Sequence, residues 1–245
     1  MSGSARVLLL PVGLLVVSLM AALGAGMWFA DRNDQHVAER FDAVTETVTM
    51  SLNERLRLYD YGLRGLRGAI ATAGPEVSRA SFERYAATRD IPAEFPGVLG
   101  FGFVRRVLPD DMGVFIDTAR AEGRPDFRVA QLLAHDGERF VIQYIEPLAG
   151  NATAIGLDIA SENRRRQTAL TAMETGKATL TPPITLLQQG GMVPGFLLLL
   201  PVYRPGMATA TPDQRRQAAI GWAYAPLMID AVLADLARVD PDIAF

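Results

Sequence analysis

The stretch Ala154–Tyr203 reads AIGLDIASENRRRQTALTAMETGKATLTPPITLLQQGGMVPGFLLLLPVY. At its start, apolar residues alternate with small or polar ones, which is the period of a half-buried strand. Ser161 is a candidate N-cap for a following helix, and Gly176 is a natural stop for that helix. Thr179–Thr181 and Phe196–Val202 favour two further strands. The order strand, helix, strand, loop, strand predicts an α+β fold.

The segments on both sides of this stretch continue the mixture of helices and strands. Periodicity predicts further strands at Val98–Val107, Phe127–Leu133, Phe140–Ile145 and Ile220–Tyr224, and helices at Asp110–Glu122 and Pro226–Val239. His135 is expected in a solvated turn, Arg164–Arg166 on a solvated helix face, and the polar Thr209–Gln217 in a loop. Gly100 and Gly102 share one strand face, which favours either the close approach of a ligand or a tightly packed sheet.

The N-terminus has the composition of a membrane segment. Val7–Ala30 is a run of 24 residues without a charge, preceded by Arg6. About 20 apolar residues span a bilayer, so residues 1–30 are predicted to be a transmembrane anchor in the inner membrane. A cleaved signal peptide is the alternative, although its apolar region is normally shorter. Both interpretations place the rest of the chain outside the cytoplasm, in the periplasm or beyond the cell.

Residues 31–73 are predicted to form one long helix, which Gly74-Pro75 ends. Apolar residues recur along it from Val37 to Ile70 at a mean spacing of about 3.67 residues, close to an 11-residue repeat. Such a stripe packs either on the helix's own domain or on a second copy of the chain. The second interpretation predicts a stalk that forms a homodimeric coiled coil.

Composition excludes several classes of function. The 245-residue chain has a net charge of −3, no cysteine and two histidines. No basic field suggests nucleic acid, and neither a thiolate nor a multi-histidine metal site is available. No P-loop, nucleophile elbow or zinc-protease motif is present. We therefore predict no catalytic residue, no metal and no cofactor, although an enzyme whose catalytic carboxylates lie far apart in sequence stays open.

Five pieces of the chain, in this order, resemble the CHASE domain, an extracytoplasmic sensor module of bacterial receptors and plant cytokinin-receptor kinases. They are Pro96–Val107, Ala154–Arg165, Ala172–Leu187, Phe196–Tyr203 and Ile220–Leu236. The resemblance implies PAS-like antiparallel-sheet subdomains behind a long helix, in tandem, with the second one incomplete. It also implies a ligand-sensing domain at residues 74–245 that is truncated at its C-terminus.

Asp158 is the strongest candidate site residue. Its apolar neighbours point to the other strand face, so its carboxylate faces water, caps the following helix or enters a pocket. In the plant receptors that the chain resembles, an aspartate at this position and the main chain of a leucine 22 residues later bind an adenine-type ligand. That spacing selects Leu180 here. Predicted apolar lining comes from Tyr144, Leu197 and Leu199, for which ordinary core positions are the alternative.

These observations predict the ligand-sensing input domain of a membrane-bound signal-transduction receptor. The resemblance implies a histidine kinase of a two-component system, or a diguanylate or nucleotide cyclase, as the output beyond Phe245. An anchored binding or scaffold protein without signalling output is the alternative, and an exported hydrolase is a third.

Overall fold

The computed structural model describes residues 4–74, 77–188 and 191–230, and in the first helix it describes the side chains of residues 18–24, 27–28 and 45–73. The chain divides into two units, Met1–Leu52 and Asn53–Phe245. The predicted long helix is present as part of α1 (Ser4–Ala73). The second unit contains the last turns of α1 and all the other elements that are described below.

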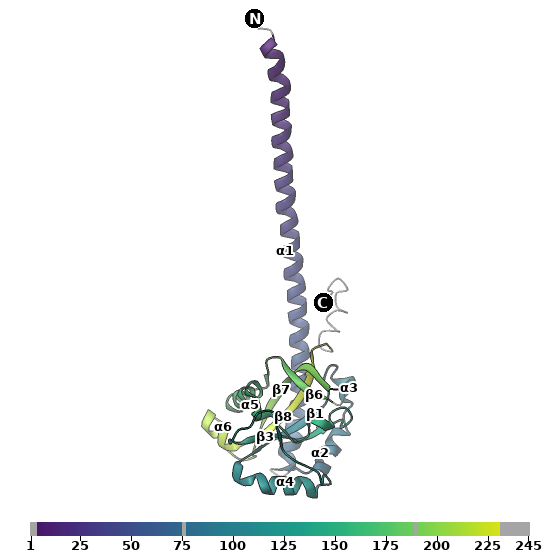
Figure 1. The fold of residues 1–245 in the computed structure, drawn as a ribbon, viewed down its shortest axis with the longest axis vertical. Helices are drawn as coiled ribbons and strands as arrows, with labels where there is room; N and C mark the ends of the chain where they lie inside the picture. The colour runs from purple at the N-terminus through teal and green to yellow at the C-terminus, as the bar shows by residue number, and fades with distance from the viewer. Residues whose placement is uncertain (1–3, 75–76, 189–190, 231–245) are drawn as a thin grey trace. The chain divides into compact units, whose positions relative to one another are not determined.

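A single sheet of eight strands forms the centre of the second unit (Figure 1). Its order is β2-β4-β3-β1-β8-β7-β5, and β6 pairs with β7. The strands are β1 (Phe101–Val107), β2 (Ala130–Gln131), β3 (Arg139–Glu146), β4 (Leu157–Asp158), β5 (Thr179–Leu180), β6 (Ile184–Gln188), β7 (Gly191–Tyr203) and β8 (Ala219–Met228). β2 and β4 run parallel, so the sheet is mixed rather than purely antiparallel as predicted.

Short helices occupy the connections. They are α2 (Arg79–Ala86), α3 (Ile91–Glu94), α4 (Met112–Ala121), α5 (Asn163–Thr175) and α6 (Pro212–Ala218), with the 3-10 turns η1 (Pro109–Asp111), η2 (Ala152–Ala154) and η3 (Ile159–Ser161).

The end of α1 packs on one face of the sheet. Tyr59, Leu63, Leu66 and Ile70 are at most 1% exposed and belong to the same cluster as the ring of Phe101 on β1. Their spacing of three and four residues places them on one side of the helix. Burying each such side chain contributes about 1.5–3 kcal/mol relative to exposure. This part of the apolar stripe therefore packs on its own domain.

α5 covers the opposite face together with η2 and η3. Ala169, Ala172 and Met173 of α5 share a core cluster with Trp222 and Tyr224 of β8. The indole Nε1 of Trp222 donates to the carbonyl of Ala169 at 2.9 Å, which fixes the helix to the sheet. The predicted stop of this helix is confirmed, because Gly176 adopts the left-handed conformation at φ 74°.

Gly102 on β1 shows how the sheet admits a large aromatic side chain. A Cβ atom at this position would overlap the ring of Tyr224 and the main-chain carbonyl of Tyr144. The bare face of the glycine is therefore filled by a protein ring. Of the two predicted reasons for small residues on this strand, the tightly packed sheet is the one realised at Gly102.

Several predicted elements differ from the structure. The predicted loop after Pro183 contains strand β6, and the predicted polar loop after Thr209 contains α6. β8 continues to Met228, so no helix begins at Pro226; Ile229 and Asp230 are helical, and the predicted helix from residue 231 onward lies outside the described residues. Glu162 rather than Ser161 caps α5. Among the described residues one sheet accounts for all strands, and the predicted tandem of PAS-like subdomains is not confirmed.

The predicted membrane anchor falls largely outside the residues whose side chains are described. Within the described part of the chain, no helix is both long enough and apolar enough to cross a membrane.

Candidate functional site

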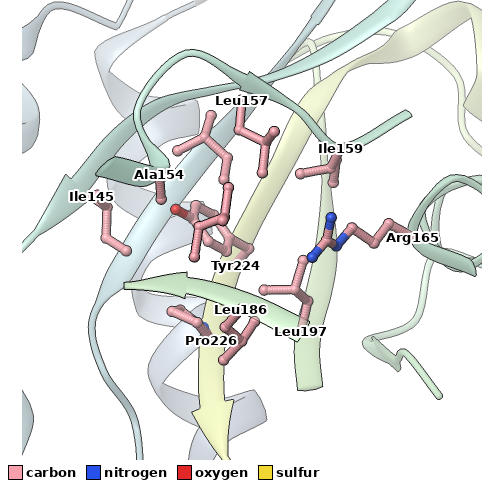
Figure 2. Close-up of a pocket in the computed structure, with 11 residues that line it drawn as sticks. Ile145, Ala154, Leu157, Ile159, Arg165, Leu186, Leu197, Tyr224 and Pro226 are labelled. Atoms are coloured by element: carbon pink, nitrogen blue, oxygen red, sulfur yellow. The ribbon is translucent and has the colours of Figure 1, made fainter. Parts of the chain in front are cut away.

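A small cavity lies in the core between the sheet and the segment from η2 to α5 (Figure 2). Its volume is about 20 Å³, which is the space of roughly one water molecule. Eleven residues line it: Ile142, Ile145, Ala154, Leu157, Ile159, Arg165, Leu186, Leu187, Leu197, Tyr224 and Pro226. Nine of these side chains are apolar. A ligand larger than a water molecule would have to displace some of them.

The hydroxyl of Tyr224 is one of the two polar groups in this apolar wall. The residue is fully buried on β8, and its oxygen has no hydrogen-bond partner in the described structure. Burial raises the pKa of this phenol far above its usual range, so the group stays protonated and can donate a hydrogen bond. Figure 2 shows the hydroxyl on the side of the cavity near Ala154.

The guanidinium of Arg165 is the other polar group. The residue is 3% exposed, and its Nη2 donates to the main-chain carbonyl of Thr185. Its Nε and Nη1 are buried and have no hydrogen-bond partner. Burial lowers the pKa of Arg165, partly opposed by the nearby carboxylate of Glu162. Figure 2 shows the guanidinium extending from α5 toward Ile159 and Leu197.

The carboxylate of Glu162 does not pair with this guanidinium. Its two oxygens accept hydrogen bonds from the main-chain N–H groups of Arg164 and Arg165, at 3.0 and 3.1 Å, and thereby cap α5. An unpaired buried ion costs several kcal/mol. Among the described residues Arg165 therefore has no direct ion-pair partner at the cavity wall, and Glu162 compensates its charge only in part.

An open groove of about 450 Å³ lies on the outer side of Arg165. Arg165 and Leu187 line both the groove and the cavity. The other groove residues come from the start of α5 and from β6 and β7 and their surroundings: Leu132, Glu162, Arg164, Pro183, Ile184, Thr185, Met192 and Pro194. Arg165 thus separates the cavity from a solvent-accessible surface.

Asp158, the first predicted site residue, is fully buried but lines neither the cavity nor the groove. Its Oδ1 accepts from the main-chain N–H groups of Phe140 at 2.9 Å and Ala160 at 3.0 Å. Its Oδ2 lies 2.7 Å from Nε2 of His135 and within 3.8 Å of Nε of Arg139. Of the alternatives that the sequence left open, exposure to water is wrong, and the carboxylate caps the 3-10 turn η3 rather than the helix α5, which Glu162 caps.

His135 was predicted to be a solvated turn residue, and that prediction is wrong. Its ring is half-buried and contacts the Asp158 carboxylate, while its Nδ1 accepts from the main-chain N–H of Gly137 at 3.2 Å. The turn that contains His135 is thereby attached to β4. His135 and Asp158 therefore belong to one hydrogen-bond network at this edge of the sheet.

The remaining predicted site residues are divided between the two faces of the sheet. Leu197 lines the cavity, and Leu199 is buried in the same core cluster without lining it. Tyr144 and Leu180 belong to the cluster on the α1 face. The hydroxyl of Tyr144 donates to Oε2 of Glu122 at 2.7 Å. The structure therefore does not bring the five predicted residues into one site.

Arg165 was missed because it stands in a run of three arginines that reads as a solvated helix face. The sequence nevertheless holds a signal. Arg165 precedes Ala169 by four residues, so it falls on the apolar stripe of α5 rather than on the polar side. Among the described residues, no group of three or more histidine, cysteine, aspartate or glutamate side chains is placed to hold a metal ion.

Comparison with known proteins defines the class to which this domain belongs. The family model described as CHASE domain matches residues 75–245. The chain therefore belongs to the CHASE domain family, and this membership supports an extracellular sensor domain. A search of curated proteins gave no match.

Among solved structures, the chain is similar to an extracellular ligand binding receptor from Desulfohalobium retbaense DSM5692. The identity is 14% and the TM-score 0.39, and the match covers 78% of this chain. It spans 27% of the length of that receptor.

Proposed function

We propose that this protein is the extracytoplasmic input domain of a membrane-bound receptor, and that it binds a small organic ligand in the cavity between the sheet and α5. One observation carries the proposal. A cavity lined by apolar side chains contains two buried polar groups, Arg165 and Tyr224, that still have unpaired donors. Apolar pockets with few convergent polar groups are the usual form of small-molecule sites. Leu197, which was predicted from the sequence as a site residue, lines this cavity.

The two regions outside the sensor fold have proposed roles as well. The uncharged run Val7–Ala30 supports a membrane anchor in residues 1–30. On α1, Tyr61 is 76% exposed and Leu58 is 42% exposed. Large apolar side chains on the outer side of a helix support a homodimer through residues 31–73. Ligand binding would then shift the dimer and act on a kinase or cyclase output that follows residues 74–245.

The proposal is tested by measuring thermal unfolding of the full chain in detergent against a library of small metabolites that includes adenine. We expect at least one compound to raise the midpoint, since a ligand at 100 times its Kd stabilises by about 2.7 kcal/mol. Ala154→Leu fills the cavity and should abolish that shift. Ala152→Leu lies on the same turn but is exposed, so it is the matched control and should keep the shift.

Two results would contradict the proposal. Equal stabilisation of the wild type and Ala154→Leu would place the ligand elsewhere on the domain. A library in which nothing stabilises the wild type would favour the scaffold protein. An exported hydrolase would instead turn over a library compound and lose that turnover in a folded Tyr224→Phe variant.

A further inference from the structure

We infer that the cavity takes a small organic acid, with its carboxylate bound by Arg165 and its apolar body against the surrounding aliphatic side chains. This inference rests on the proposed function, because it names the chemical class of ligand for the same site. It starts from the guanidinium, which is the only cationic group among the described residues that line the cavity.

The hydrogen-bonding capacity of Arg165 is largely unused. A guanidinium has five N–H donors, and here Nε and Nη1 carry three of them without an acceptor. The one protein acceptor is the carbonyl of Thr185, which meets Nη2. Carboxylates match the planar donor pairs of a guanidinium through two parallel hydrogen bonds. Each of these donor pairs includes Nη2, which uses one of its two N–H groups for Thr185, so a carboxylate can pair the other N–H of Nη2 with the vacant N–H of Nε or of Nη1.

Charge gives a second, independent reason. Glu162 is the acid whose charge acts on Arg165, and its oxygens accept hydrogen bonds from the N-terminal N–H groups of α5. No other carboxylate of the described residues compensates Arg165. An anionic ligand would supply the missing charge and would gain from the low dielectric around it. A neutral ligand would leave the buried cation without an ion-pair partner.

The shape and lining of the cavity restrict the rest of the ligand. Apart from Arg165, the described part of the wall offers a single polar group, the Tyr224 hydroxyl, which lies on the other side of the cavity in Figure 2. A phosphate monoester, with two charges and more oxygens, would find too few donors. A monocarboxylate with a branched or aromatic body would contact the aliphatic wall after some of these side chains have moved apart. A hydroxyl or carbonyl at its far end would use Tyr224.

The route into the cavity also passes Arg165. The side chain lines both the outer groove and the inner cavity, so an acid that enters through the groove passes Arg165 before it reaches the cavity. Movement of Arg165 and Leu187 would join the two spaces and enlarge the volume of about 20 Å³ that is present without ligand.

The experiment compares acids with their uncharged amides. Binding of 4-methylpentanoate and phenylacetate, and of 4-methylpentanamide and phenylacetamide, is measured at pH 7 by calorimetry on the full chain in detergent. We expect at least one acid to bind the wild type, and its amide to bind more weakly by about 10- to 100-fold, the range of hydrogen bonds to a charged group.

Variants assign this preference to one residue. Arg165→Met should lower the affinity for the acid to that of the amide. Arg164→Met is the matched control, because Arg164 also donates to a carbonyl of the same segment, that of Pro183 at 2.9 Å, but lines only the groove. It should keep the acid preference. Arg165→Lys keeps the charge without the planar donor pair and should show an intermediate preference. It tests the same contact if Arg165→Met does not fold.

The outcomes separate this inference from the function on which it rests. Equal binding of acid and amide by the wild type would overturn the inference that Arg165 binds a carboxylate. An unchanged acid preference in Arg165→Met would do so as well. The carboxylate inference also fails if no acid binds while a neutral compound of the metabolite library does. The proposed sensor function would not be contradicted by that result. If no compound of either set binds, both proposals fail.

Discussion

Two buried charges in this domain lie seven residues apart in the chain and have opposite surroundings. The carboxylate of Asp158 is fully buried and meets main-chain N–H groups, a histidine and an arginine. The guanidinium of Arg165 is equally buried, but two of its three nitrogens have no partner. A buried charge that is satisfied by the protein stabilises the fold. A buried charge that lacks partners costs free energy, and a ligand is the natural compensation.

The largest expected effect comes from removing the satisfied charge. Asp158→Ala leaves the N–H groups of Phe140 and Ala160 unpaired and removes the partner of His135, so we expect a loss of about 3–5 kcal/mol. Urea denaturation followed by circular dichroism measures it. Asp136→Ala, at an exposed position in the neighbouring turn, is the control and should change stability by less than about 0.5 kcal/mol.

A stable Asp158→Ala variant that no longer binds a ligand would contradict this comparison. It would instead support the direct contact that the sequence predicted, in which Asp158 and the main chain of Leu180 bind an adenine-type ligand. Asp158→Asn refines the result, because its amide oxygen can still accept from one of the two N–H groups.

Much of the fold could be predicted from the sequence, because several elements have clear local patterns. β7 and β8 alternate or run apolar over many residues, and Gly176 ends α5 through its positive φ. β6 was missed because Pro182-Pro183 and the glutamines after Leu187 resemble a loop. α6 was missed because it has no apolar stripe, although Thr211 and Gln214 form a capping box that is visible in the sequence.

The site could be predicted less well, because its residues are brought together only by the pairing of strands in the sheet. Tyr224 on β8 contributes to the same cavity as Ala154 and Arg165, and no local pattern links these three residues. The network around Asp158 likewise depends on β3 and on the turn at His135. Arg165 alone had a local signal, its position on the apolar stripe of α5.

Two buried tyrosines extend the comparison from charges to hydroxyls. The Tyr144 hydroxyl donates to Glu122 and accepts from Nε2 of Gln143 at 2.8 Å, whereas the Tyr224 hydroxyl has no partner. Tyr144→Phe should therefore lose about 1–2 kcal/mol, since it leaves bonded groups unsatisfied, and Tyr224→Phe should be neutral within about 0.5 kcal/mol. Urea denaturation of the pair measures the difference.

The pH dependence of the tyrosine variants gives a check. Burial, followed by the contact with Glu122, raises the pKa of Tyr144 above its unfolded value, so its contribution to stability is present below pH 10 and is lost as pH rises beyond it. Tyr144→Phe should reduce the fall in stability above pH 10. A comparable stability loss in both variants would mean that the Tyr224 hydroxyl has a partner in solution, such as a buried water.

The smallest expected change in stability is that of Arg165→Met. The substitution removes a buried charge that has no ion-pair partner and replaces it with a flexible apolar side chain of similar length. The carbonyl of Thr185 loses a donor, but Thr185 is an exposed residue, so water can replace that bond. We expect stability to stay equal or to rise by about 1 kcal/mol in urea denaturation without ligand. A loss near that of Asp158→Ala would show that Arg165 serves the fold as the aspartate does, and the distinction between the two buried charges would then fail.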